Sequence, residues 1–572
     1  MTLIRPRPFY DRQSEPVAMR LKFSKFYLLT GLTAIILLLL GIFTWIFFGR
    51  IYNSEVQKNL FFSQNSDLSF SYSTWLFTHP PMRNTMKFFF FNLTNPDEVK
   101  YNGDIPHVVE VGPFIAMESE EKKYVEWSKK SDMMFYQNYK KYVLSSENSC
   151  QDCSWEKNII FPNPPGLGAV TSMIDPQFEI NKMGRTIIAT FLLLSGEYPF
   201  VSHKVREILF DGYDDALLSA AHSKLVALIS GIFKGDQGSI VPIPIPDMPR
   251  FGYFQGYNNS RDEEYWVKTG KDDINKLGEI VSWAGIKKLP SAWWSTDYSR
   301  SIRGSDSGSF NQMNLNESSK IEFFMSFMCR SFTMSYKESK MIQGIPSLSF
   351  NVPYDEWDTT SSKNTGFRYR NIEKRNYFPD WPTCPPKGKC EQSGSIDCSK
   401  SENFCHACCD GSLYNGTYLL PPGMFPLVCY PGRLQPSPFS VIYSAPHYLF
   451  SPREVFETVV GMKPNAELHD PMIYSHEPYS GTVVEVINRM QVNMPVIKSH
   501  DVPSSMNMRD IVIPLFWHES HAILSSFVYD KLWIGFVLVP KLVTSLQFIA
   551  IGLGLLIFAV LAFFKLRSIK KQ

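Results

Sequence analysis

The residues best suited to chemistry in this sequence are the cysteines and the histidine of the stretch 404–410, which reads FCHACCD. Cysteine and histidine can hold zinc, whereas paired cysteines form disulfides. A structural zinc site needs two ligand pairs at fixed spacing. Cys405 and Cys408 supply one pair only, and His406 lies between them. We therefore predict disulfides, and no metal or other cofactor.

The chain has ten cysteines, an even number that does not require a free thiol. Six of them lie within residues 384–409, where about 15 pairings are open and sequence alone does not choose among them. Cys150 and Cys153 are close enough to close a small loop. All ten are predicted disulfide cysteines: Cys150, Cys153, Cys329, Cys384, Cys390, Cys398, Cys405, Cys408, Cys409 and Cys429.

Candidate catalytic motifs fail on spacing or residue type. In Trp517–Ala522 (WHESHA), His518 and His521 are three residues apart, whereas the zinc-protease motif places its histidines four apart on one helical face. We expect a polar turn there. Gly304–Gly308 has Asp at the position where a nucleophile elbow needs Ser. Neither stretch supports an enzyme, and the sequence predicts a protein that is not one.

Two segments, 26–48 and 542–564, each run for 23 residues without a charge. A hydrocarbon core of about 30 Å needs about 20 helical residues, so each can span a membrane. The first is too long and too bulky at its end for a cleaved signal peptide, which indicates a retained signal anchor. The prediction is a tail at 1–25, an ectodomain at 49–541 and a second tail at 565–572.

Basic residues flank both segments on their outer sides. Five Lys or Arg residues precede the first segment from Arg7 to Lys25, and four follow the second from Lys565 to Lys571. The positive-inside rule then predicts that both tails are cytosolic. The cysteines all lie between the segments, in the oxidising compartment that favours disulfides. The same region holds the predicted glycosylation sites Asn92, Asn258, Asn316 and Asn415.

The predicted ectodomain is mainly β with a helical region near residues 180–235. Alternating or apolar runs at 86–92, 323–328, 348–352 and 482–492 predict strands. Apolar residues at helical spacing between 187 and 232 predict the helices. The net charge of +2 does not favour a nucleic-acid partner.

Six spaced blocks, together with the two terminal apolar segments, resemble the class B scavenger receptor family. The resemblance covers residues of about 25 to 565. The blocks are 91–99 (FNLTNPDEV), 109–114 (VEVGPF), 205–213 (VREILFDGY), 268–276 (KTGKDDINK), 327–331 (FMCRS) and 489–493 (RMQVN).

The resemblance implies an α+β fold: a large, mainly antiparallel β ectodomain with an internal apolar tunnel and a helical-bundle cap, anchored by two transmembrane helices. It also implies a disulfide between Cys329 and Cys429. The sequence departs from the family pattern in its richer cysteine-rich region, 384–429. It has no lysine at Leu194–Glu197, where some members carry lysines implicated in binding acyl ligands. The tail 565–572 lacks an acidic dileucine, which weakens a lysosomal address.

The resemblance further implies a cell-surface receptor that binds lipids, fatty acids, lipoprotein particles or other polyanionic or lipidic ligands, and passes lipid to the membrane. Packing of the cap's own core is the alternative role for the candidate lipid-binding residues. These candidates are Leu192, Leu193, Leu194, Phe200, Leu225, Leu228, Ile229 and Ile232.

Several alternatives stay open from the sequence. A phagocytic receptor, or a sorting receptor for protein cargo in the endosomal or lysosomal membrane, would share the family and the topology. A homo-oligomer is compatible with either location. A two-span ligand-gated channel is a further alternative. The first segment offers such a pore few small or polar residues, chiefly Thr30, Thr33 and Thr44.

Overall fold

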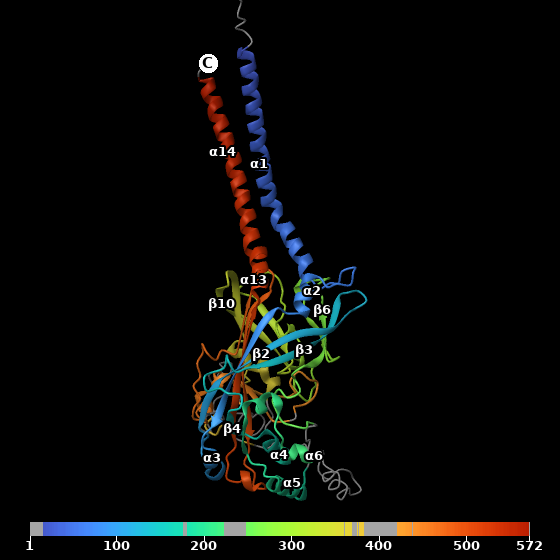
Figure 1. Cartoon of the computed structure of the whole chain (residues 1–572), viewed down its shortest axis with the longest axis vertical. Helices are drawn as coiled ribbons and strands as arrows, with labels where there is room; N and C mark the ends of the chain where they lie inside the picture. The colour runs from blue at the N-terminus through green and yellow to red at the C-terminus, as the bar shows by residue number, and fades with distance from the viewer. Residues whose placement is uncertain are drawn as a thin grey trace, which may run out of the picture. The chain divides into compact units, whose positions relative to one another are not determined.

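The structure is a computed structural model that describes residues 15–174, 180–221, 248–359, 361–368, 375, 377–381, 420–437 and 439–570 (Figure 1). The chain divides into two compact units. One combines Met1–Asn59 with Phe527–Gln572, and the other is Leu60–Ser526. The first unit is helical and the second is built on a large sheet, which confirms the α+β class.

The helical unit contains α1 (Glu15–Leu60) and α14 (Val539–Ile569), with α13 (Ser526–Trp533) and the π-helix η8 (Ile534–Leu538) leading into α14. The ranges Lys25–Leu60 and Ser526–Arg567 are long and apolar enough to cross a membrane. The two helices approach closely at glycines: a Cβ on Gly41 would meet Ile551 Cγ1 at 2.5 Å. The predicted segments 26–48 and 542–564 lie inside these ranges.

The threonines of the first apolar segment bond to their own helix. The hydroxyls of Thr30, Thr33 and Thr44 each donate to the backbone carbonyl four residues earlier, at 2.8–2.9 Å. A hydroxyl satisfied in this way needs no polar partner in a hydrocarbon environment. These residues therefore fit an anchor helix better than the lining of a pore.

The main sheet has the strand order β7-β6-β3-β2-β1-β16-β15-β14-β11-β10-β9-β8, with β12 and β13 attached beside β15. All of its neighbours pair antiparallel except β8 and β9. The strands are β1 (Met82–Leu93), β2 (Val108–Trp127), β3 (Met133–Ser145), β6 (Ser260–Lys268), β7 (Ile280–Trp283), β8 (Ser305–Asp306), β9 (Lys320–Met325), β10 (Arg330–Ile342), β11 (Ile345–Asn351), β12 (Met424–Pro426), β13 (Ile442–Ser444), β14 (Met472–His476), β15 (Val483–Val496) and β16 (Ile511–Leu524).

The two ends of this strand order meet. Glu279, beside β7, forms a bridge with Ser305 of β8, and the Ile280 amide donates to the Gly304 carbonyl at 2.9 Å. Only glycine fits at Gly304, where φ is +76° and a Cβ would collide with the Glu322 backbone. The sheet therefore closes on itself and encloses its inner face.

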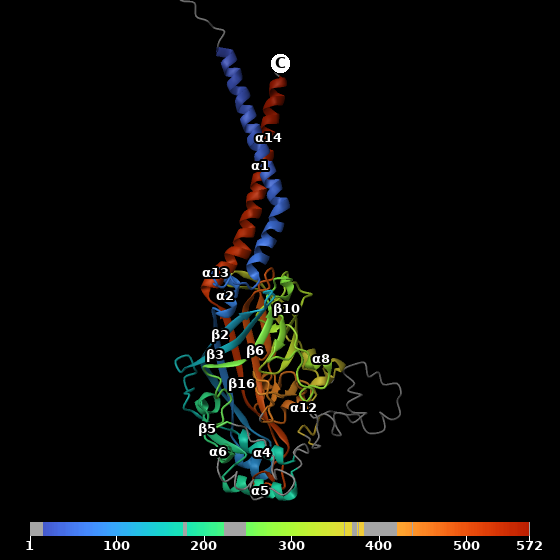
Figure 2. The same ribbon diagram turned by 90° about the vertical axis from the view of Figure 1, so that its right-hand side faces the viewer.

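The sheet has two ends that differ in what they carry. Met82 of β1 pairs with Leu524 of β16, so the chain leaves the unit at the end where β1 begins. We call this the entry end; it also carries α2 (Tyr72–Thr78). At the other end, the cap end, lie α3 (Pro96–Asn102), α4 (Pro164–Ile174), α5 (Lys182–Leu194) and α6 (Ala216–Ala221) (Figure 1 and Figure 2).

Shorter elements complete the unit. A separate two-stranded sheet pairs β4 with β5. The remaining elements are β4 (Asn158–Pro162), β5 (Phe200–Lys204), η2 (Glu207–Asp211), η3 (Ile274–Lys276), α8 (Asp297–Arg300), α9 (Tyr354–Trp357), η4 (Ser362–Phe367), η6 (Pro446–Tyr448), α12 (Arg453–Phe456) and η7 (Pro503–Ser505).

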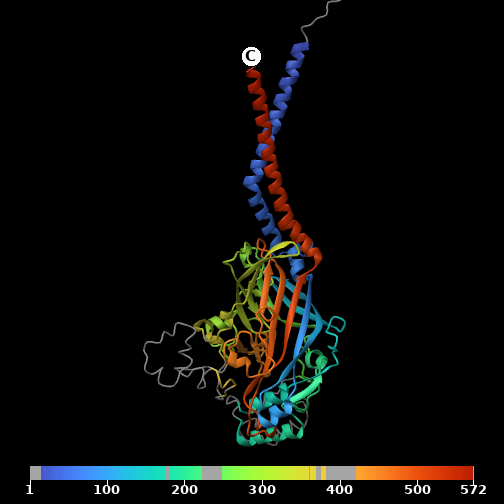
Figure 3. The ribbon, with the colours of Figure 1, turned by 90° about the vertical axis from the view of Figure 1, so that its left-hand side faces the viewer.

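Three of the predicted strands, 86–92, 348–352 and 482–492, lie in β1, β11 and β15, apart from an end residue in the last two. Of the fourth, 323–328, only residues 323–325 belong to β9, and 326–328 form a turn. The prediction of a polar turn at 517–522 is wrong, because these residues lie inside β16 between β1 and β15 (Figure 3). Glu519 explains how a polar run fits there: it pairs with Lys87 on one neighbouring strand and Arg489 on the other, both at 2.7 Å. Pro514 sits where the register between β15 and β16 shifts, at a bulge that tolerates proline.

The helical region also differs from its predicted bounds of 180–235. Helix begins earlier, at Pro164, and the strand β5 interrupts it. Residues 222–247 lie outside the described residues, and so does the six-cysteine cluster at 384–409.

Candidate functional site

Helix α5 at the cap end is amphipathic and begins at a capping residue. The side chain of Asn181 accepts a hydrogen bond from the Gly184 amide at 2.8 Å. One face of α5, including Ile188, Ala189 and Leu192, is buried against α4, Leu217 of α6 and Val502. Burial of that face fixes the helix and turns its other side chains outward.

The exposed side of this end carries large apolar side chains beside polar ones such as Lys182, Thr186 and Thr190. Leu194 is 81% exposed, a high value for a leucine in a folded domain. Exposed apolar groups that gather in one place mark interaction sites more often than isolated ones do. We define the cap patch as the large exposed hydrophobic residues of α3, α5, the α5–β5 turn and the segment after η7: Tyr101, Met183, Leu193, Leu194, Tyr198 and Met506.

One cation joins two parts of the cap patch. The Lys100 ammonium lies 4.7 Å from the ring centre of Tyr101 and 4.5 Å from that of Tyr198. Lys100 therefore links α3 to the turn after α5. It also supplies a positive charge beside the apolar groups, although no lysine occurs at Leu194–Glu197.

The candidate lipid-binding residues divide into four groups. Leu192 is buried in the packing of the cap, while Leu193 and Leu194 are exposed on its surface. Phe200 lies in β5 and is partly buried against the sheet core. The candidates outside the described residues are Leu225, Leu228, Ile229 and Ile232.

A pair of carboxyl groups ties three cap segments together. Glu197 accepts hydrogen bonds from the Asn163 amide group at 2.7 Å and from the Leu217 backbone amide at 3.2 Å. Asp215 caps α6 through the Leu218 amide at 3.0 Å. Burial, followed by repulsion from Asp215, raises the pKa of Glu197 to about 7. Burial likewise raises the pKa of Asp215.

The interior of the closed sheet is lined by aromatic rings. Phe88 of β1 lies edge-on to Phe210, Phe254 and Phe516, with ring centres 5.7–6.2 Å apart. His518 faces the same cluster, and burial lowers its pKa to about 4. The inner face of β16 therefore presents a neutral histidine to an apolar surrounding.

Toward the entry end the inner faces of β2 and β3 become polar. The Lys122 ammonium contacts Glu120 at 2.5 Å and Asn138 at 2.9 Å, and the Asn138 amide group donates to both Asp262 and Asp306. Burial, followed by repulsion from Asp306, raises the pKa of Asp262 well above its ordinary value. Burial also acts to raise the pKa of Glu120, but Lys122 and Lys140 outweigh it and lower that pKa to about 2.

This polar group could not be predicted from the sequence. Residues 118–123 (ESEEKK) are polar on both faces of the strand, so their alternation does not reveal which side is buried. Its partners lie on β3, β6 and β8, far away in sequence. Equally, Glu197 and Asp215 are joined only by the folding of the cap.

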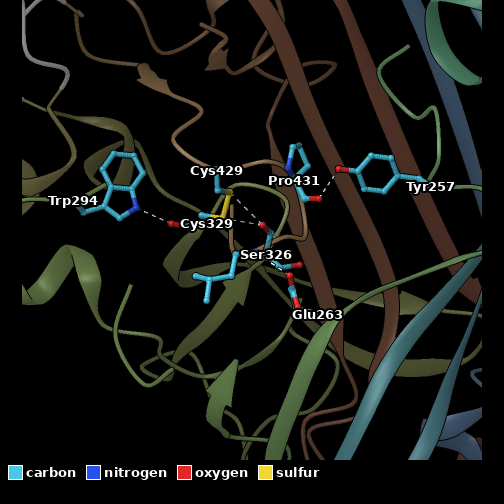
Figure 4. Close-up of a disulfide and its surroundings, with 8 residues drawn as sticks. Tyr257, Glu263, Trp294, Ser326, Cys329, Cys429 and Pro431 are labelled. Carbon is cyan, nitrogen blue, oxygen red and sulfur yellow. Dashed lines mark hydrogen bonds between the residues drawn. A yellow bond between two sulfur atoms is a disulfide. The ribbon is translucent and has the colours of Figure 1, made fainter. Parts of the chain in front are cut away.

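Cys329 and Cys429 form a disulfide with a Cα–Cα distance of 6.2 Å (Figure 4). Cys150 and Cys153 form another. The Trp294 indole donates to the Cys329 carbonyl at 2.7 Å. The guanidinium of Arg330, the next residue, is fully buried and lies 3.8 Å from the ring centre of Phe367. Burial lowers the pKa of Arg330 to about 10.

A second polar group joins side chains of β2, β16 and η6. His447 Nε2 and the Trp517 indole both contact the Glu110 carboxylate, at 2.7 and 2.8 Å. The His469 ring stacks on His447 with centres 4.3 Å apart, and burial lowers the pKa of His469 to about 4. Among the described residues no three His, Cys, Asp or Glu side chains form a group that could hold a metal.

Three of the four predicted glycosylation sites lie in described segments. Asn258 and Asn316 are exposed, and the side-chain oxygen of each accepts a hydrogen bond from a backbone amide. Asn92 in β1 is partly buried and accepts the Ile160 amide at 2.8 Å. Asn415 lies outside the described residues.

Comparison with known proteins gives one consistent result. The model of the CD36 family matches residues 31–565. An uncharacterized protein of Caenorhabditis elegans is 42% identical over 544 residues, which cover 95% of this chain and 98% of that relative. Lysosome membrane protein 2 of Rattus norvegicus is 25% identical over 89% of this chain and 87% of its own length. Scavenger receptor class B member 1 of Bos taurus is 24% identical over 95% and 89% respectively.

Proposed function

The chain belongs to the CD36 family, and on this premise we propose that it takes lipid from a particle or carrier and passes it through the ectodomain to the membrane. The coarser statement, a two-pass membrane protein of the class B scavenger receptor type, follows from the family and the two apolar helices. The proposal adds the cargo, the route and the place where cargo docks.

The physical need for such a route comes from the cost of hydrating hydrocarbon. Each methylene left in water costs about 0.8 kcal/mol, so a 16-carbon chain faces on the order of 10 kcal/mol between a carrier and a bilayer. A sheltered path removes most of this barrier. Transport then follows the concentration gradient and needs no chemical energy.

The closed sheet supports this route. An eight-stranded barrel is about wide enough for side chains to fill, and larger barrels leave space for ligands or channels. Here twelve strands follow one another around the closed order. The aromatic lining around Phe88 and Phe516 suits hydrocarbon better than it suits ions.

The cap patch is the observation that carries the proposal. Leu193 and Leu194 are 60% and 81% exposed at the end of α5, supported by buried Leu192 directly before them. When a lipidic surface covers leucines that a folded helix presents to water, the burial of their apolar area lowers the free energy of the complex. We infer that a lipoprotein or another lipid carrier docks here.

The topology proposed for this function has both tails in the cytosol, because basic residues flank the outer sides of both helices. The sheet unit then faces the cell exterior or the lumen of an organelle, where Asn258 and Asn316 would carry glycans. We propose the plasma membrane as the main location. Similarity to lysosome membrane protein 2 keeps the lysosomal membrane as an alternative.

The test is uptake of a labelled acyl lipid from lipoprotein particles by cells expressing the full chain. We expect Leu193→Ser with Leu194→Ser to reduce particle binding and lipid uptake together, because the docking surface loses its apolar groups. Leu468→Ser is the matched control, since Leu468 is 61% exposed outside the cap. Unchanged binding in the cap variant at equal surface expression would contradict the proposal.

A receptor for protein cargo is the second candidate, because lysosome membrane protein 2 is as similar to this chain as the scavenger receptor is. In both candidate functions the ligand would dock on the cap. The same cells distinguish the two functions when protein binding and lipid transfer are measured together. Protein captured without lipid transfer would favour the cargo receptor. The family match favours either receptor over a two-span channel.

A further inference from the structure

The segment directly after α1 exposes a second apolar group, at the entry end of the sheet unit. Leu68 is 74% exposed, Tyr72 49% and Trp75 43%. Tyr72 and Trp75 are three residues apart in α2 and so share one face of this helix. We call Leu68, Tyr72 and Trp75 the entry patch.

The entry patch sits on a rigid support. Phe62 is buried and stacks on Phe77 of α2, with ring centres 4.6 Å apart. The Ser63 amide donates to the Thr74 hydroxyl at 2.8 Å, and the Ser71 amide donates to the Ser63 carbonyl at 2.9 Å. These contacts bury one face of α2 and fix Tyr72 and Trp75 on the other.

Leu68 lies at the tip of a tight turn, in an unfavourable setting. The Leu68 amide donates to the Asn65 carbonyl at 3.0 Å, and its φ is +67°, a left-handed conformation that leucine rarely adopts. The side chain gains little packing in return, because it points into solvent. An apolar surrounding outside the unit would stabilise this leucine.

Chain connectivity places the entry patch near a bilayer. Leu60, which starts the sheet unit, ends the helix that contains the first membrane segment. The second membrane segment is reached through Ser525, at the end of β16. The Ser525 amide donates to the carbonyl of Pro81, three residues after α2, at 2.8 Å. Both routes into the membrane therefore begin beside α2.

Basic residues lie on the same side. The Phe62 amide donates to the Thr269 carbonyl, and the Thr269 amide donates to the Asp132 carbonyl, which links the turn between β2 and β3 to Phe62, the residue that supports α2. Lys129 and Lys130 are exposed in that turn. Their ammonium groups can meet phosphate oxygens of phospholipid head groups, the polar layer that tryptophan and tyrosine prefer.

We propose that the entry patch inserts into the interfacial layer of the same bilayer that α1 and α14 span, on the ectodomain side. Trp75 and Tyr72 lie at the head-group level, and Leu68 reaches toward the acyl chains. The inference needs the two membrane helices and does not depend on lipid transfer.

The experiment places the full chain in nanodiscs of phosphatidylcholine that contain a phospholipid with a photoreactive diazirine near the top of its acyl chain. After illumination, mass spectrometry locates the labelled residues. We expect label at Leu68–Trp75 as well as on α1 and α14, which are internal positive controls. Label on α1 and α14 with none at Leu68–Trp75, or equal label on the cap patch, would overturn the proposal.

Two variants distinguish membrane contact at the entry patch from nonspecific labelling of exposed apolar residues. We expect Leu68→Ser, Tyr72→Ser and Trp75→Ser together to abolish labelling of residues 60–80, while Met183→Ser, Leu193→Ser and Leu194→Ser together leave it unchanged. Persistent labelling of 60–80 in the first variant would contradict insertion by these side chains. If that variant does not fold, the labelling of the wild-type chain still decides.

Discussion

At the scale of single residues, Glu197 and Asp215 form a pair of buried carboxyl groups in the cap whose protonation responds to pH near neutrality. Burial, followed by repulsion from Asp215, raises the pKa of Glu197 to about 7 in the folded protein, from an ordinary value of 4.5. A raised carboxyl pKa means that the folded state holds its proton more tightly than the unfolded state does. The stabilisation by protonated Glu197 is therefore complete below about pH 4.5 and is lost as the pH rises through about 7.

We predict that the contact between Glu197 and α6 is tighter at pH 5.5 than at pH 8. A shift of this size is worth on the order of 2–3 kcal/mol, enough to change local opening by more than tenfold. Hydrogen exchange at the Leu217 and Leu218 amides, corrected for its intrinsic pH dependence, measures the effect. Glu197→Gln keeps the shape and cannot ionise, so the protection of the Leu217 amide should depend less on pH than in the wild type, with Asp215 as the remaining titrating group. A wild-type profile as flat as that of Gln would refute the assignment.

Two buried histidines of the sheet, His476 and His518, respond in the opposite sense. Burial lowers the pKa of His518 and of His476 to about 4, below their ordinary 6.5. Their neutral forms stabilise the fold above about pH 6.5, and this contribution is lost as the pH falls toward 4. Acidification therefore tightens the cap locally while it weakens the sheet, so local exchange is more informative than a global melting curve.

At the scale of elements, strands and helices were predictable where the pattern is local, and the site was not. The apolar run in β1 and the alternation in β15 identify strands without knowledge of their partners. The run Trp517–Ala522 looks like a turn because its ion pairs, from Glu519 to Lys87 and Arg489, join residues far apart in sequence. The sequence prediction treated Leu192–Leu194 as one group. In the helix, Leu192 points inward, while Leu193 and Leu194 point outward.

The start of α5 gives an element-scale prediction. Asn181→Ala removes the hydrogen bond to the Gly184 amide and should weaken the first turn of α5 by about 1 kcal/mol. Faster hydrogen exchange over residues 184–187 is the expected result. Asn181→Ser keeps a capping oxygen and should remain close to wild type. Equal exchange in the Ala and Ser variants would show that the cap does not hold this turn.

At the scale of the whole molecule, a long-range disulfide joins distant parts of the sheet unit. The Cys329–Cys429 disulfide spans a sequence separation of 100, whereas Cys150–Cys153 spans 3. In the chain-entropy account a loop of 100 residues stabilises a fold by about 4–5 kcal/mol, and a loop of three by about 1.5. The family resemblance pointed to the long link, because spacing alone left the pairing open.

We therefore predict unequal effects of removing the two disulfides. Cys329→Ser with Cys429→Ser should lower the melting temperature and the amount of protein at the cell surface strongly. Cys150→Ser with Cys153→Ser should lower them only slightly. Equal losses in the two double variants would argue against loop length as the source of stability.

The central claim at this scale is that hydrocarbon crosses from a carrier to the bilayer inside the closed sheet. The most direct test is transfer of a radiolabelled acyl lipid from donor particles into liposomes that carry the full chain with its sheet unit outside. We predict faster transfer than into protein-free liposomes, with the excess lost in Leu193→Ser with Leu194→Ser. Equal rates with and without the protein would contradict the account.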